Sequence, residues 1–137
     1  MDALGHHLLI ELYGCDANVL NNCEKIEKIM KNAALLANAH IVESAFHQFN
    51  PHGVSGVVII AESHFSIHTW PEFGYAAVDI FTCGEELRPD IAHAYMSDQF
   101  RSKSSTIVEM KRGIIPLPTV TPAGSFSEQK EAVVAGK

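Results

Sequence analysis

Reactive side chains interrupt the most apolar segment of the chain. Residues 57–61 read VVIIA, and Glu62 and Ser63 follow them directly before apolar residues resume. His68 and a lone Cys83 lie further along the same segment. Side chains of these types serve three kinds of chemistry: metal binding, nucleophilic hydrolysis, and the reaction of a serine with its own backbone to make a carbonyl cofactor.

A metal site needs ligands that converge at a recognisable spacing. His64 and His68 are four residues apart and would share one face of a helix, but their β-branched and aromatic neighbours favour a strand. With Cys83 they make a possible zinc set, to which His47 or His52 could add a ligand. No carboxylate or second cysteine stands at a matching spacing, so we expect no metal.

Hydrolytic chemistry is the second possibility. Ser63 is not part of a GxSxG motif, and no strand-to-helix turn follows it. Cys83 ends an apolar stretch and could be a thiol nucleophile with His68 as its base. A cysteine in an apolar strand is inert more often than reactive, so the residues also allow a purely structural interpretation.

The third possibility is self-processing at Ser63. A serine hydroxyl can attack the preceding peptide carbonyl and turn the amide into an ester, which oxyanion donors and a strained turn favour. Removal of the serine α-proton then cuts the chain by β-elimination and leads to a pyruvoyl group. The pyruvoyl ketone forms a Schiff base with a substrate amine and accepts the electrons released on decarboxylation. Ser63, His68 and Cys83 fit the serine, base and proton donor of this scheme, although their spacing alone does not select it.

The elements that must position these residues follow an α+β order. Apolar periodicity and turn residues predict a helix that begins at Ala17, is capped by Asp16 and continues to about Ala37. A second helix is expected from Pro89 to about Phe100. Strands are predicted at residues 6–14, 40–49, 54–61, 65–70, 75–83 and 106–110. This order predicts a mostly antiparallel sheet with helices on one face.

Composition restricts the classes of function. The 137 residues suit one domain, and a net charge of −6 gives no footprint for nucleic acid or an anionic membrane. No apolar run approaches the roughly 20 residues of a membrane span, and the N-terminus has no basic region of a signal peptide. The three cysteines, Cys15, Cys23 and Cys83, are odd in number without CxxC spacing, so we expect free thiols and a cytoplasmic protein. Residues 113–137 contain three prolines and read as a mobile tail after a domain of residues 1–112.

Two long motifs in the centre of the chain resemble one known family. "ESHFSIHTWPE" and "GYAAVDIFTCG" are similar to the prokaryotic-type S-adenosylmethionine decarboxylases, pyruvoyl enzymes that make decarboxylated S-adenosylmethionine for spermidine synthesis. Phe65 stands where a leucine is expected. The resemblance covers about residues 4–112 and includes "GHHLLIELYGCD", "FHQF" and "GVSGVVIIAESH". It implies a two-layer α/β sandwich that forms a homodimer through its sheets, with four layers (α/β/β/α) and two sites near the interface.

The resemblance also implies roles for single residues. The proenzyme would cut itself between Glu62 and Ser63, giving a β chain of residues 1–62 and an α chain from residue 63 that begins with pyruvoyl. His68 matches the proton acceptor of processing, and Ser55 matches a serine that assists it. Cys83 matches the proton donor to the product carbon.

Two further matches concern the substrate. Glu72 matches a carboxylate that holds the ribose hydroxyls, and Phe49 matches an aromatic ring that stacks on adenine. From the residues alone, Phe49 could equally be a core aromatic, Glu72 a turn residue and Ser55 a local hydrogen-bonding group. No metal or pyridoxal phosphate is implied. The alternative functions are a pyruvoyl-dependent arginine or ornithine decarboxylase on the same fold, and an unprocessed, non-catalytic relative.

Overall fold

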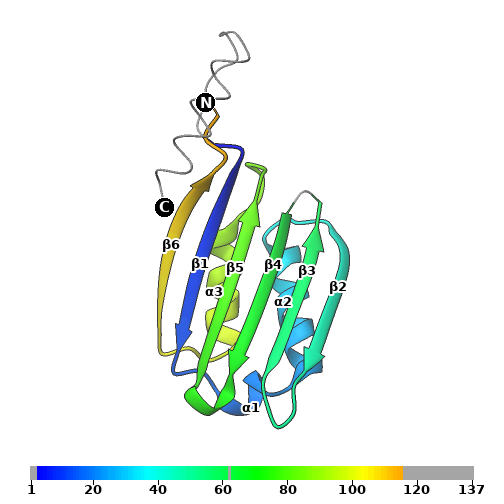
Figure 1. Cartoon of the computed structure of the whole chain (residues 1–137), viewed down its shortest axis with the longest axis vertical. Helices are drawn as coiled ribbons and strands as arrows, with labels where there is room; N and C mark the ends of the chain where they lie inside the picture. The colour runs from blue at the N-terminus through cyan, green and yellow to red at the C-terminus, as the bar shows by residue number, and fades with distance from the viewer. Residues whose placement is uncertain (1–2, 62, 116–137) are drawn as a thin grey trace, which may run out of the picture.

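Six strands form one antiparallel sheet in the computed structural model, which describes residues 3–61 and 63–115. The strand order is β2-β3-β4-β5-β1-β6, so the first strand of the chain lies between β5 and β6 (Figure 1). The elements are β1 (Gly5–Tyr13), α1 (Ala17–Leu20), α2 (Cys23–Leu36), β2 (Ile41–Gln48), β3 (Val54–Ile60), β4 (Ser63–Trp70), η1 (Pro71–Phe73), β5 (Tyr75–Thr82), α3 (Pro89–Gln99) and β6 (Ser104–Arg112).

The helical segment differs from the sequence prediction. Asp16 caps α1 as expected, and its carboxylate accepts the backbone N–H groups of Asn18 and Val19 at 2.9 and 3.2 Å. The single predicted helix is nevertheless wrong, because α1 ends and α2 begins anew at Cys23. Asn22 causes the break: its side chain accepts the backbone N–H of Lys25 at 3.1 Å and so caps α2. Asparagine competes for backbone hydrogen bonds in this way and favours caps over helix interiors.

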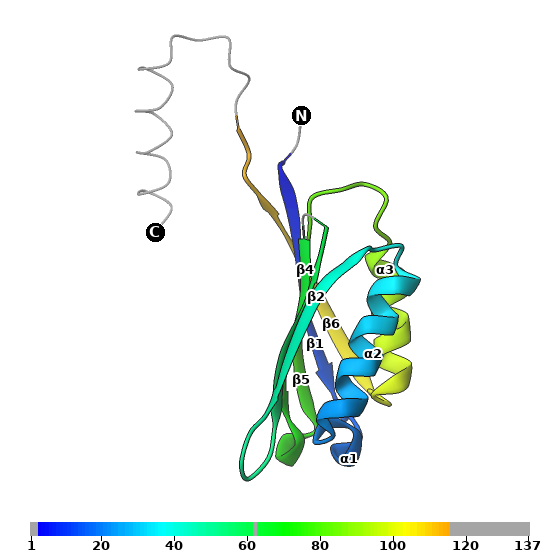
Figure 2. The ribbon, with the colours of Figure 1, turned by 90° about the vertical axis from the view of Figure 1, so that its right-hand side faces the viewer.

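The core lies between one face of the sheet and the helices α2 and α3 (Figure 2). Phe65 and Ile67 of β4 are fully buried there, while His64 and His68 lie on the other face, because side chains alternate along a strand. Burial of a side chain of this size stabilises the fold by about 1.5–3 kcal/mol. Gly56 of β3 leaves room for the Phe46 ring, because a Cβ at position 56 would lie 1.9 Å from Phe46 Cδ2.

The opposite face of the sheet, called the open face below, has no helix over it (Figure 2). Large apolar side chains stand exposed on it, and Ile59 of β3 is 42% exposed. A continuous apolar run such as that of β3 is typical of a strand covered on both faces, but within one chain only one of its faces is covered. The other exposed apolar side chains of this face include Leu9, Val108 and Met110.

The last strand, β6, ends at Arg112, close to the boundary expected for the domain. Residues 116–137, which make up most of the expected tail, lie outside the described residues. None of the helices in the described ranges is long and apolar enough to cross a membrane.

Candidate active site

Ser63 and Cys83 meet at one end of the sheet. Ser63 opens β4, and Cys83 follows the last residue of the neighbouring strand β5. The backbone N–H of Cys83 donates a hydrogen bond of 3.2 Å to Ser63 Oγ. Cys83 and Cys15 are both free thiols, but Cys83 is exposed and Cys15 is buried. The structure thus brings the Ser63 hydroxyl against the backbone of a cysteine that lies twenty residues later in the sequence.

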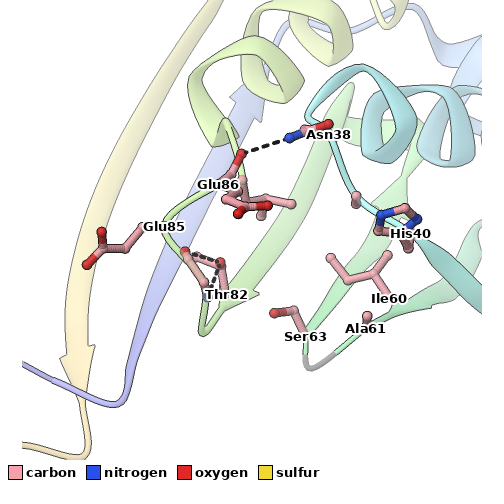
Figure 3. Close-up of a pocket in the computed structure, with 11 residues that line it drawn as sticks. Asn38, His40, Ile60, Ala61, Ser63, Thr82, Glu85 and Glu86 are labelled. Atoms are coloured by element: carbon pink, nitrogen blue, oxygen red, sulfur yellow. Dashed lines mark hydrogen bonds between the residues drawn. The ribbon is translucent and has the colours of Figure 1, made fainter.

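A pocket of about 460 Å³ lies beside Ser63 on the helix side of the sheet. Figure 3 shows Ser63, Ile60 and Ala61 on one side of it, with Asn38 and Glu86 across from them. The Asn38 side chain donates to the Glu86 carbonyl at 3.3 Å, which fastens the loop after β5 to the end of α2. The pocket gives small molecules a route to Ser63.

Ser55 and His68 form a second pair, on the open face. They are register partners on β3 and β4, and Ser55 Oγ is hydrogen-bonded to His68 Nδ1 at 2.7 Å. The Trp70 ring lies 6.4 Å from the imidazole, centroid to centroid. Ser55 is therefore placed to fix one nitrogen of the predicted base.

Glu72 and Phe49 lie near this second pair, at the turns that end β4 and β2. Glu72 Oε1 in η1 lies 3.1 Å from His52 Nε2, a contact that joins two loops. Phe49 is 47% exposed and contacts the His47 ring edge-on, with 4.6 Å between centroids. Phe49 is thus no core aromatic, and its ring is available to a ligand.

The two pairs are far apart within one chain. His68 stands five residues after Ser63 on the straight strand β4, and a strand rises by about 3.3 Å per residue, so roughly 16 Å separate their backbones. Glu72 lies further still in the same direction. The structure brings together Ser63 with Cys83, and Ser55 with His68, but it does not bring the pairs together. Glu62 lies outside the described residues.

Comparison with known proteins identifies the family. The family model described as S-adenosylmethionine decarboxylase matches residues 6–113. The chain belongs to the S-adenosylmethionine decarboxylase family. It is 58% identical over 118 residues to the S-adenosylmethionine decarboxylase proenzyme of Acetivibrio thermocellus, with 86% of this chain and 95% of that protein covered. It is 59% identical over 116 residues to the proenzyme of the same name from Pelotomaculum thermopropionicum, with 85% and 92% covered.

A solved structure supports the same S-adenosylmethionine decarboxylase fold. The crystal structure of the adenosylmethionine decarboxylase from Aquifex aeolicus superposes with a TM-score of 0.80 at 38% sequence identity. The match covers 88% of this chain and all of that one. The predicted family and the predicted α+β fold are therefore confirmed.

Sequence reasoning missed one group of this S-adenosylmethionine decarboxylase family member. Tyr75 lies between Trp70 and Tyr13 on the open face, with ring centroids 5.2 and 5.6 Å apart. Its hydroxyl donates a hydrogen bond to the Glu11 carboxylate. Burial, and then this contact with Glu11, raises the pKa of Tyr75 to about 12. The sequence signal that could have pointed to this group is the alternation of β1, which puts Glu11 and Tyr13 on one face of the sheet.

The metal alternative finds no support in the part of the chain that the structure describes. Within those residues, no three histidine, cysteine or acidic side chains are placed to hold a metal ion. The four histidines considered for a zinc set instead contact different partners: His68 contacts Ser55, His52 contacts Glu72, His47 contacts Phe49 and His64 contacts Phe81.

Proposed function

We propose that this chain is the proenzyme of a self-processing, pyruvoyl-dependent S-adenosylmethionine decarboxylase. It would convert S-adenosylmethionine to S-adenosylmethioninamine and CO2 for spermidine biosynthesis in the cytoplasm. The observation that carries the proposal is the contact of 3.2 Å between Cys83 N–H and Ser63 Oγ beside a pocket, in a chain of this family. The names of the relatives favour S-adenosylmethionine over arginine or ornithine as the substrate.

Processing begins at Ser63 in this proposal. Its Oγ attacks the carbonyl carbon of residue 62, and the amide becomes an ester as the nitrogen leaves. His68, fixed by Ser55, then takes the α-proton of residue 63. The ester C–O bond breaks by β-elimination, so residue 62 keeps a carboxylate and residue 63 becomes dehydroalanine, which water converts to pyruvoyl with loss of ammonia.

The residues around position 63 fit such a group. Position 63 is the first residue of β4, so a cut before it frees a chain end without removing any strand pair. The pocket supplies room for water at that end. A pyruvoyl ketone supplies the electron sink that decarboxylation of an amino acid needs.

The chain's own side chains would then hold the substrate and protonate the product. Cys83 is exposed, its backbone N–H contacts Ser63 Oγ, and its thiol would donate a proton to the carbon that loses CO2. The Glu72 carboxylate accepts hydrogen bonds from the ribose hydroxyls, a geometry that suits a two-oxygen acceptor. Phe49 stacks on adenine with its exposed ring.

A second copy of the chain would complete the site. The separation of roughly 16 Å between Ser63 and His68 along β4 prevents one chain from assembling it. Two copies packed open face to open face, with β4 running in opposite directions, bring the Ser63 end of each to the His68 end of the other. A twofold axis makes two equal sites of this kind. The exposed apolar side chains of the open face support such burial and the resulting α/β/β/α layers.

Mass spectrometry and CO2 release test the function. Purified protein, denatured after incubation, should give two masses split between residues 62 and 63, the second with a terminal carbonyl. It should release CO2 from S-adenosylmethionine and not from arginine or ornithine. Ser63→Ala should leave one mass and no activity. A single uncut mass for the unmodified chain would reject the proposal, and turnover of only the basic amino acids would replace its substrate.

A further inference from the structure

Three basic side chains surround the Phe81 ring on the open face. The Arg112 guanidinium lies 5.7 Å from the ring centroid, and the rings of His7 and His64 lie at 5.8 and 5.7 Å. These four residues come from β1, β4, β5 and β6, and we call them the Phe81 cluster. A guanidinium held over an aromatic face is oriented by the ring, so its donors have a preferred direction.

Arg112 has donors to spare within this cluster. It donates one side-chain hydrogen bond, of 3.2 Å, to His7 Nδ1. No carboxylate of the described residues lies within 4 Å of it. The nearest acid of the network, Asp79, is 3.4 Å from the other nitrogen of His7 and also accepts from Ser66 at 3.2 Å. An exposed guanidinium with five N–H groups, most of them unused, is suited to bind an anion.

The cluster adjoins the place where the proposed chemistry occurs. Phe81 lies two residues before Cys83, which follows the last residue of β5, so the cluster lies at the Cys83 end of the sheet. His64 follows Ser63 directly and is the register partner of Phe81. Glu72 of the proposed substrate site lies at the opposite end of the sheet. Arg112 thus lies at the Cys83 end of the open face, away from Glu72.

We propose that Arg112, oriented by His7 and Phe81, binds the α-carboxylate of the substrate. This rests on the proposed function, because the carboxylate is attached to the carbon that Cys83 protonates there. A planar guanidinium pairs with a carboxylate through two parallel hydrogen bonds and thereby fixes its orientation. Arg112 keeps all its protons throughout. Once the carboxylate has left as CO2, the product no longer offers Arg112 a partner, so the contact favours substrate over product.

Comparison of substrate and product binding tests this assignment. In processed Arg112→Gln, the KM for S-adenosylmethionine should rise roughly tenfold with little change in kcat, the loss expected for one charged hydrogen-bonded pair. The dissociation constant of decarboxylated S-adenosylmethionine, measured by calorimetry, should stay at the wild-type value. The KM of Arg112→Lys for S-adenosylmethionine should fall between the values of the wild type and Arg112→Gln. Lys111→Gln is the matched control, since it removes the same charge from the other face of β6 and should alter neither ligand.

Two outcomes overturn the assignment while the function stands. Either Arg112→Gln weakens substrate and product equally, which indicates a general structural role, or it weakens neither. If Arg112→Gln is not cleaved, Arg112→Lys carries the same comparison, and equal losses for both ligands again reject the assignment. Failure of the proposed function is seen separately, because the wild-type chain then shows no cleavage or no CO2 release.

Discussion

Two inactive variants of this chain should restore activity to each other. Ser63→Ala removes the reacting group from one end of the sheet, and Glu72→Ala removes a substrate contact from the other end. If each site takes one end from each copy, a mixed dimer contains one site damaged twice and one site fully intact. The intact site joins the unaltered Ser63 end of the Glu72→Ala chain to the unaltered Glu72 end of the Ser63→Ala chain.

The size of the recovery follows from the twofold arrangement. Random pairing of equal amounts gives half mixed dimers, each with one working site of two, so about a quarter of the wild-type activity should return. Mixed dimers isolated through two different affinity tags should reach about half of the wild-type activity per dimer.

The assay is CO2 release from S-adenosylmethionine by co-expressed chains, compared with each variant alone. Ser63→Ala paired with Cys83→Ala is the matched control, because both changes damage the same end and no site is left intact. Isolated mixed dimers of Ser63→Ala and Glu72→Ala that show no more activity than their parents would refute the shared site. Residues that lie roughly 16 Å apart along β4, Ser63 and His68, would then have to act together in some other way.

Three further predictions concern single contacts. Ser55→Ala removes the 2.7 Å hydrogen bond to His68, so self-cleavage should slow by about tenfold or more. A time course of intact mass measures this rate, and cleavage at the normal rate would refute the role of Ser55 in processing. The pKa of Tyr75 is raised from 10.0 to about 12, so its phenol should titrate late by ultraviolet absorbance and earlier in Glu11→Gln. Because the folded pKa is the higher one, this stabilisation is present below about pH 10 and is lost as the pH rises towards 12. Gly56→Ala should destabilise the fold by about 1–3 kcal/mol in denaturant unfolding, since its Cβ would overlap Phe46, and an unchanged midpoint would contradict the packing.

Local pattern was sufficient to predict most elements of the fold. The strands β4 and β5 are signalled by alternation and the helix α3 by its first-turn proline, and each of these signals lies within the element itself. The structure has all three elements at the expected places. Local pattern did not predict where β1 pairs. Its insertion between β5 and β6 is a contact between distant parts of the chain that periodicity does not encode. The break before Cys23 was visible in Asn22, but the apolar helical spacing continues across it.

The site was predictable as a set of residues and not as an arrangement. The motif around Ser63 contains the reacting serine and His68 five residues apart, which suggests proximity in a sequence. In an extended strand, five residues instead place Ser63 and His68 roughly 16 Å apart. The neighbouring strand brings Cys83, twenty residues later, into contact with Ser63. Arg112 and Tyr75 were missed because their partners, His7 and Glu11, lie on β1, about a hundred and about sixty residues earlier in the chain.

The strand order also determines what a cut before residue 63 leaves behind. The earlier fragment would hold β1, β2 and β3, and the later one β4, β5 and β6, yet β1 lies between β5 and β6. Three of the five strand pairings would then join different polypeptides, so the fragments are interleaved and cannot part while the sheet survives. Before the cut, folding is a first-order event in one chain. After it, refolding from the denatured state becomes a second-order encounter whose rate depends on concentration, so the uncut precursor is the form best able to find this fold.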